Sequence, residues 1–151
     1  MRPKPGIGLV TEADLARLIE VWEASVRATH HFLSESDIAF LRPLVGHGLL
    51  KLERLVCVRG ANGQVTAFAG ISEHKLEALF IDPAGRGTGI GRNLLRYAVD
   101  NLGVTTVDVN EQNEQAVGFY LHMGFVTEGR SETDGLGKPF PLLHMRLRPR
   151  S

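Results

Sequence analysis

The sequence predicts one mixed α/β domain that spans residues 1–151. Apolar runs of strand length and apolar patterns of helical spacing follow one another along the chain. Three of the short runs stand together and lead into a glycine-rich segment, after which a helical pattern begins at once. No internal repeat, linker or low-complexity tract divides the chain, and its length is typical of a single domain.

The first expected elements are a short strand and a helix. Residues 6–10 form an apolar run of strand length. Thr11, followed three residues later by Asp14, is a helix N-cap pattern, because such side chains can bond the exposed backbone N–H groups of a first turn. Apolar residues then recur at helical spacing, so we expect a helix that ends near Arg27–Ala28.

A second helix is expected directly afterwards. Ser34 and Asp37 repeat the cap pattern at its start. Apolar residues at helical spacing follow, namely Ile38, Leu41, Leu44, Val45 and Leu49. Pro43 lies among them and has no N–H group to donate, so we expect it to kink or split this helix.

Three antiparallel strands are expected before the glycine-rich segment. The apolar runs Leu55–Val58 and Val65–Ile71 are separated by Asn62–Gly63, a pair typical of hairpin turns. A second turn at Ser72–His74 leads into a third run, Leu76–Ile81.

The chain continues with a helix from Ile90 that Gly103 is expected to end. A strand is expected over 104–109. Asn113 can cap the next helix and Gly124 can end it. The inward face of that helix is expected to hold Ala116, Val117, Tyr120 and Leu121.

Two further strands are predicted after Gly124. Phe125–Val126 begins one of them, and Asp134–Gly135 turns the chain. Apolar residues alternate with His and Arg over 143–147, which predicts a last, half-buried strand.

Composition excludes several classes of protein. The 17 Lys and Arg balance the 17 Asp and Glu, so a zero net charge argues against broad nucleic-acid binding. Cys57 is the one cysteine, which excludes a disulfide within the chain and a Cys metal cluster; we expect it in the core. No apolar run approaches the roughly 20 residues that span a membrane, and no signal peptide is visible. A cytoplasmic protein without membrane partners is therefore expected.

The glycine-rich segment, Asp82–Arg92, predicts an anion site. It lies between a strand and a helix start, where unpaired N–H groups carry partial positive charge. Glycines allow close approach to the backbone, and Arg86 and Arg92 add full charges. The most plausible ligand is a phosphate or pyrophosphate.

Two common phosphate motifs do not fit. A P-loop needs Lys and then Ser or Thr after its last glycine, but Ile90-Gly91-Arg92 follows Gly89. A Rossmann fingerprint that begins at Gly87 would need a glycine at position 92, which is Arg. Asp108 stands at about the ribose-binding distance, but the remaining chain is too short for the rest of a Rossmann sheet.

A third pattern does fit. Arg86-Gly87-Thr88-Gly89-Ile90-Gly91 resembles the Arg/Gln-x-x-Gly-x-Gly/Ala signature of the GNAT family of N-acetyltransferases, and the spaced residues of 113–125 resemble its second cofactor motif. This resemblance implies a mostly antiparallel mixed sheet flanked by helices. In it, the parallel strands 76–82 and 104–109 would splay apart to admit acetyl-CoA as cosubstrate, with no metal.

The resemblance also implies the cofactor-binding residues. The backbone of Leu79, Phe80 and Ile81 would pair with the pantetheine arm, and Asn113 would contact the pantetheine or its phosphates. The pyrophosphate would be bound by Arg86, Gly87, Thr88, Gly89, Ile90, Gly91 and Arg92. Tyr120 matches a family tyrosine that lies near the thioester sulfur.

Acetyl transfer to an amine suggests two further roles. Tyr120 is the expected general acid for the leaving CoA thiolate. Glu77 is the expected general base, because regular alternation would place it on one face with Leu79 and Ile81, where a carboxylate among apolar residues is notable. The competing bases are His30, His31 and His74.

The acceptor stays open. Trp22, His30, His31, Phe32 and the loop 136–142 are expected to shape its pocket. A small amine, an amino acid, a peptide N-terminus, a lysine or an antibiotic would all suit, as would a monomer or a homodimer, and longer acyl-CoAs are not excluded. The alternatives are a non-catalytic module that binds CoA or acyl-CoA and, more distantly, a dinucleotide-binding protein.

Overall fold

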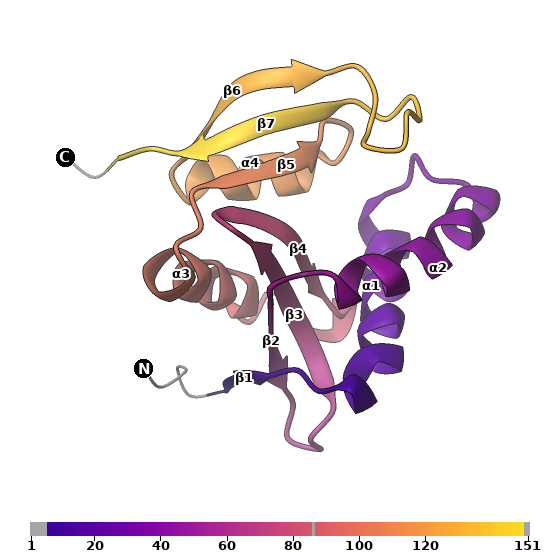
Figure 1. The fold of residues 1–151 in the computed structure, drawn as a ribbon, viewed down its shortest axis with the longest axis vertical. Helices are drawn as coiled ribbons and strands as arrows, with labels where there is room; N and C mark the ends of the chain where they lie inside the picture. The colour runs from indigo at the N-terminus through magenta and orange to yellow at the C-terminus, as the bar shows by residue number, and fades with distance from the viewer. Residues whose placement is uncertain (1–5, 86, 150–151) are drawn as a thin grey trace.

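The computed structural model describes residues 6–85 and 87–149. A seven-stranded mixed sheet runs in the order β1-β2-β3-β4-β5-β7-β6 (Figure 1). The strands are β1 (Ile7–Leu9), β2 (Arg54–Arg59), β3 (Val65–Ser72), β4 (Lys75–Ile81), β5 (Thr106–Asn110), β6 (Phe125–Ser131) and β7 (Leu142–Leu147). No helix in the described part of the chain is long and apolar enough to cross a membrane.

Among the described residues, four helices cover the two faces of this sheet. They are α1 (Leu15–Thr29), α2 (Glu35–Leu50), α3 (Ile90–Leu102) and α4 (Glu114–His122). The apolar side of α1, with Leu18 and Val21, packs on Phe68 of β3. On the opposite face, Leu94 of α3 belongs to a core that also holds Met145 of β7. Single turns of 3-10 helix, Glu12–Asp14 and Pro83–Gly85, precede α1 and α3.

The predicted helix starts in the N-terminal half are confirmed. The backbone N–H of Thr11 donates to Asp14 at 2.8 Å, and a 3-10 turn leads into α1. Ser34 and Asp37 bond each other's backbone N–H groups at the start of α2. Of the two outcomes expected at Pro43, a kink or a split, the split does not occur, because α2 runs unbroken through this residue.

The three strands β2, β3 and β4 pair antiparallel, as predicted. The register between β3 and β4 shifts, however, between Gly70, which pairs with Ala78, and Ile71, which pairs with Leu76. Glu77 falls in this irregularity, so the strand does not alternate regularly there. Leu79 and Ile81 pack towards the α3 core, whereas the Glu77 side chain is exposed.

The parallel strands β4 and β5 diverge. They pair only at Lys75 with Thr106 and at Leu76 with Val107. Beyond these positions, the second half of β4 keeps its pairing with β3 on one side alone. The mixed sheet with a splayed parallel pair is thereby confirmed (Figure 1).

The C-terminal elements follow the prediction with one exception. Gly103 ends α3 at a φ of 74°, a conformation that glycine adopts without strain. Asn113 caps α4, with its side chain accepting from the N–H of Ala116 at 3.2 Å. Leu121 was expected on the inward face of this helix but is 51% exposed. The core side of α4 is held by Tyr120.

Candidate active site

A cavity of about 340 Å³ opens beside the second half of β4. Its walls come from the last turn of α1, the end of β4, the glycine-rich segment with the start of α3, and α4. The lining residues are Ser25, Thr29, His30, Leu79, Phe80, Ile81, Gly85, Gly87, Gly89, Ile90, Gly91, Arg92, Asn113, Gln115, Ala116, Phe119 and Tyr120. Most of the expected cofactor-binding residues therefore meet at one site.

The glycine-rich segment presents backbone donors to this cavity. Gly87 and Gly89 have φ angles of 78° and 82°, which side-chain-bearing residues rarely adopt. At Gly91 an added Cβ would lie 2.8 Å from Cδ1 of Ile81, so α3 begins very close to β4. The first N–H groups of α3 have no partner within the helix and can bind an anion. Arg86 lies outside the described residues.

Thr88 plays a different part in this segment. Its hydroxyl donates to the carbonyl of Gly85 at 2.6 Å, and it does not line the cavity. The side chain therefore braces the turn, and only its backbone remains available for a ligand.

The second half of β4 forms another wall. Leu79, Phe80 and Ile81 line the cavity, beyond the last position at which β5 pairs with this strand. Backbone groups that point away from β3 there are available to an extended ligand. An arm that adds to a strand in this way gains main-chain hydrogen bonds.

Tyr120 is the buried phenol of the site. It is 7% exposed and lines the cavity from α4. Its ring contacts Phe119 and Phe125 edge-on, with centroids 5.2 and 5.7 Å away. Burial raises the pKa of the Tyr120 hydroxyl well above its usual value, so the group stays protonated at neutral pH.

A row of polar groups links α1 to α4 across the cavity wall. The Thr29 hydroxyl donates to the carbonyl of Ser25 at 2.7 Å and lies 2.8 Å from Nδ1 of His30. Nε2 of His30 lies 3.5 Å from the amide nitrogen of Asn113. The Asn113 side chain thus serves both the cap of α4 and this row.

An aromatic stack extends from this row to the β6–β7 loop. The rings of His30 and Phe32 are 5.2 Å apart, and those of Phe32 and Phe140 are 5.5 Å apart. Lys138 of the same loop lies over the ring of Phe40 on α2, 4.6 Å from its centroid. The loop expected near the acceptor pocket therefore contacts the α1–α2 turn.

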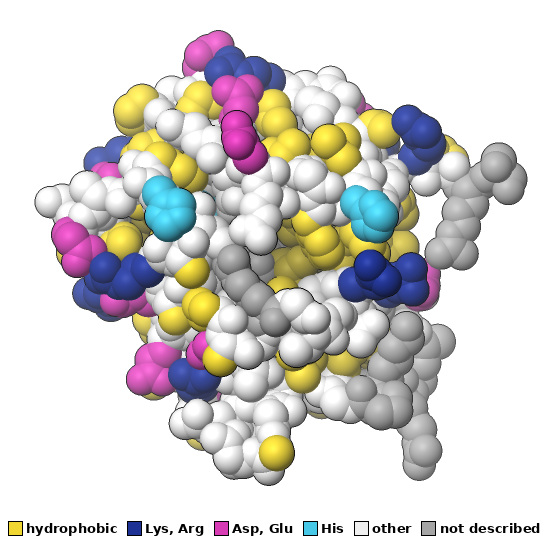
Figure 2. All heavy atoms as spheres, turned by 180° about the vertical axis from the view of Figure 1, so that it is seen from behind, with side chains coloured by type: hydrophobic (Ala, Val, Ile, Leu, Met, Phe, Trp, Pro, Cys, Tyr) yellow, Lys and Arg dark blue, Asp and Glu magenta, His cyan; other side chains and the backbone are white. Residues whose placement is uncertain are grey.

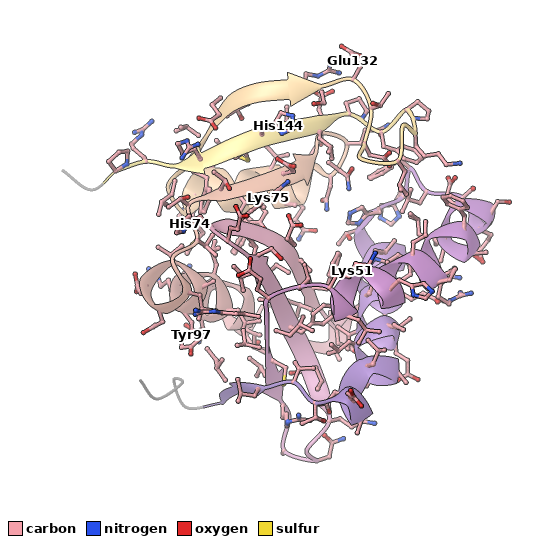
Figure 3. All side chains as sticks on the ribbon, in the orientation of Figure 1. Lys51, His74, Lys75, Tyr97, Glu132 and His144 are labelled. Carbon is pink, nitrogen blue, oxygen red and sulfur yellow. The ribbon has the colours of Figure 1, made fainter. Side chains whose placement is uncertain are left out.

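Several expected site residues do not line the cavity. Trp22 is 4% exposed and belongs to the core between α1 and the sheet. His31 is exposed. His74 lies on the turn before β4, where its Nδ1 is 3.0 Å from the Gly103 carbonyl (Figure 3). Glu77 lies 3.6 Å from the Lys75 ammonium.

A second polar cluster lies across β4, β5, β7 and β6. Asp108 accepts from Lys75 at 2.6 Å and lies 2.7 Å from Nδ1 of His144. Nε2 of His144 lies 2.6 Å from the Ser131 hydroxyl. Lys75 and His144 come from strands on either side of β5 (Figure 3). Burial raises the pKa of Asp108, but the hydrogen bonds from Lys75 and His144 outweigh it and lower that pKa overall.

This Ser–His–Asp row was not visible in the sequence, because its members lie on three strands that pair only in the folded sheet. None of the three lines the cavity at β4. In addition, the Lys75 ammonium binds the second carboxylate oxygen of Asp108. We therefore interpret the row as a cross-strand polar network.

A second cavity, of about 650 Å³, lies between α3 and the end of α4. Its lining includes Arg92, Arg96, His122 and Arg148, with Asp100 as the acidic member. Arg92 lines both cavities. Seen from the side of α4, the surface has a recess with hydrophobic atoms at its floor and basic side chains at its border (Figure 2).

The sequence interpretation missed part of the cavity wall. Ser25, Thr29, Gln115 and Phe119 line it and had no assigned role. The sequence did hold one signal for two of these residues. Ser25 and Thr29 are four residues apart, so they lie on the same face of α1, beside His30. Within the described residues, no group of three His, Cys, Asp or Glu side chains could hold a metal ion.

Comparisons with known proteins agree with this geometry. An acetyltransferase (GNAT) domain family matches residues 50–148. The chain is 47% identical over 129 residues to the peptidyl-lysine N-acetyltransferase YjaB of Salmonella typhimurium, which covers 85% of this chain and 88% of that protein.

Solved structures give the same result. The solution structure of apo-form YjaB from Escherichia coli matches with a TM-score of 0.84 at 40% identity, over 95% of this chain and 97% of that one. The PaiA N-acetyltransferase of Thermoplasma acidophilum, crystallised with coenzyme A, matches with a TM-score of 0.72 over 94% and 98%. At 23% identity, this second match shows the fold alone.

Proposed function

The chain belongs to the GNAT family of acetyltransferases, and from this premise we propose that it transfers the acetyl group of acetyl-CoA to a primary amine by direct attack. One observation carries the proposal. A single cavity joins the N-terminus of α3, the unpaired edge of β4 and the buried hydroxyl of Tyr120. These are an anion site, a strand edge for an extended arm and a proton donor, on three walls of the same cavity.

The residues of the cavity fit CoA. The N–H groups at the start of α3, with Gly87 and Gly89 beside them, suit its pyrophosphate. The edge of β4 at Leu79–Ile81 suits the amide-containing pantetheine arm. A relative of the same fold has been crystallised with coenzyme A, which supports this assignment. Asn113 lies within reach as a further polar contact.

Tyr120 supplies the proton that the leaving thiolate needs. As the amine attacks the thioester carbonyl, negative charge develops on the carbonyl oxygen and then on sulfur. Like any tyrosine, Tyr120 carries its hydroxyl proton at neutral pH, and it lines the same cavity, so a proton donor is present for sulfur. Backbone N–H groups near Phe80 or Ile81 are the candidates for binding the oxygen.

A peptide lysine is the acceptor that we propose first. The YjaB protein of Salmonella, 47% identical to this chain, is a peptidyl-lysine N-acetyltransferase. The other amines considered above, the oligomeric state and the cytoplasmic location stay predictions. The alternative function is a module that binds acyl-CoA without catalysis, for which a protonated phenol in the cavity would have no use.

The test begins with calorimetric titration of acetyl-CoA and, separately, of NAD into the purified protein. We expect acetyl-CoA to bind in the micromolar range and NAD not to bind. Free CoA release is then measured with a lysine-containing peptide. Binding without release in a broad amine screen would favour the binding module, and no binding of acetyl-CoA by folded protein would refute the proposal.

A further inference from the structure

The structure separates the candidate bases by position. His30 lines the cavity that also holds Tyr120, whereas Glu77 is paired with Lys75 outside it. His74 is bonded to the end of α3. We propose that Nε2 of His30 removes the proton from the acceptor ammonium, a role that rests on the acetyl transfer proposed above.

The hydrogen bonds around His30 assign its tautomer. The Thr29 hydroxyl has one proton, and that proton is directed to the Ser25 carbonyl at 2.7 Å. At 2.8 Å from Nδ1 of His30, the same oxygen must therefore accept, so Nδ1 carries a proton. Nε2 is then the basic nitrogen of the unprotonated ring.

The contact with Asn113 agrees with this assignment. Its Oδ1 accepts from the N–H of Ala116, so its amide nitrogen is the atom directed at Nε2 of His30. An amide nitrogen can only donate, and Nε2 accepts from it. At 3.5 Å this bond is long, so an acceptor ammonium can replace it at little cost.

The ring is also held in place. His30 follows the last turn of α1, and its own N–H donates to the Val26 carbonyl at 2.7 Å. Its ring contacts Phe32, which contacts Phe140 of the β6–β7 loop. With Nδ1 bonded to Thr29 and the ring against Phe32, the base keeps its orientation when the acceptor takes the place of Asn113 at Nε2.

The proton balance closes without a further reactant. The ammonium gives one proton to Nε2, and the free amine forms the C–N bond at the thioester carbonyl. The tetrahedral adduct breaks its C–S bond, and sulfur receives the Tyr120 proton. The nitrogen of the adduct gives its surplus proton back to the tyrosinate through water, and the imidazolium releases its own to solvent. The products are the N-acetyl amine, CoA and one proton.

The test measures how His30→Gln changes kcat/KM for two acceptors that differ in whether they need a base. A lysine peptide is an ammonium ion at neutral pH and needs a base, whereas an alkoxyamine is already unprotonated. We expect kcat/KM for the peptide to fall by about 10²–10⁴-fold, the usual contribution of a general base. The loss for the alkoxyamine should be below about tenfold, and calorimetry should give an unchanged affinity for acetyl-CoA. His47→Gln, an exposed histidine of α2, is the matched control and should leave both rates unchanged.

Two further variants, Thr29→Val and Glu77→Gln, test the base assignment independently of His30→Gln. Thr29→Val removes the acceptor for Nδ1 but keeps the shape of the side chain, and it should lower the peptide rate more than the alkoxyamine rate even if His30→Gln fails to fold. Equal losses for both acceptors would overturn the proposal, as would a peptide-specific loss in Glu77→Gln with none in His30→Gln. Wild-type protein that acetylates neither acceptor would instead refute the acetyl transfer itself.

Discussion

Tyr120 combines near-complete burial with a place on the cavity wall. Its substitution by Phe removes the hydroxyl and keeps the ring contacts with Phe119 and Phe125. Because the acid role needs only the hydroxyl, we expect saturated turnover to fall by about 10²–10⁴-fold. The affinity for acetyl-CoA should stay the same by calorimetry. Unchanged turnover at saturating acceptor would remove Tyr120 from the acid role.

The same burial predicts a dependence of stability on pH. Burial raises the pKa of Tyr120 in the folded state, whereas an unfolded tyrosine ionises near its ordinary value of about 10. Above that pH the unfolded chain releases a proton that the folded chain keeps, so stability decreases as pH rises. Tyr120→Phe should therefore gain stability relative to wild type between pH 8 and pH 10.5 in urea unfolding. A difference that does not change with pH would contradict the raised pKa.

Residue identity alone did not place the candidate bases. Glu77 was expected on one face with Leu79 and Ile81; it lies at the register shift between β3 and β4, 3.6 Å from the Lys75 ammonium, and does not line the cavity. Such a shift depends on how β3 and β4 fit together, which a single strand does not reveal. His30 was recognised as a candidate, but its hydrogen-bond partners come from α1 and α4, which lie far apart in the sequence.

Among the secondary-structure elements, the glycine-rich turn before α3 is the most constrained. Gly89 precedes the helix with a φ of 82°. Gly89→Ala should destabilise the fold by about 1–2 kcal/mol, because a side chain in the left-handed region clashes with the following carbonyl. Acetyl-CoA binding should weaken with it, since the turn presents the N–H groups of α3.

The matched control for this change is Gly118→Ala. Gly118 lies inside α4, and an added Cβ would meet no atom within 4 Å. Alanine at a helix interior is favoured over glycine by roughly 0.5–1 kcal/mol, so this variant should unfold at a higher temperature. Thermal unfolding of both variants checks the pair. A Gly89→Ala protein as stable as wild type would show that the turn tolerates a side chain.

Element boundaries could be predicted wherever the signal was local. The caps of α2 and α4 and the glycine that ends α3 were recognised, because each uses residues a few positions apart. Failures arose where distant parts decide the outcome. Pro43 sits within an unbroken α2, which packs on α1, and tertiary packing can offset the one lost hydrogen bond. Leu121, expected on the inward face of α4, is 51% exposed.

For the molecule as a whole, the divergence of β4 from β5 is the feature that the proposed reaction needs. The two strands pair at only two positions, so the two parts of the sheet are joined weakly there. A pantetheine arm along Leu79–Ile81 would supply hydrogen bonds that β5 does not. Acetyl-CoA at about 100 times its Kd should stabilise the fold by about 2.7 kcal/mol.

Hydrogen exchange of the backbone amides checks this expectation. Protection should rise in the segment 79–81 when acetyl-CoA is added, and by more than the general gain that ligand binding gives β2, which is already paired on both sides. A uniform increase along the whole sheet would instead indicate general stabilisation without an added strand.

The fold itself was predictable through the family resemblance, whereas the Ser131–His144–Asp108 row and the Phe32–Phe140 contact depend on pairings that no local pattern encodes.

The strand order has a consequence for biosynthesis. β7 is the last strand along the chain, yet it lies between β5 and β6. While the ribosome is still translating residues 132–147, β6 has no strand to pair with and β5 pairs with the rest of the sheet only through β4. The C-terminal part of the sheet can therefore form only after Leu147 has left the exit tunnel. A premature stop codon before residue 142 would remove an interior strand and leave two open edges, a target for chaperones and proteases.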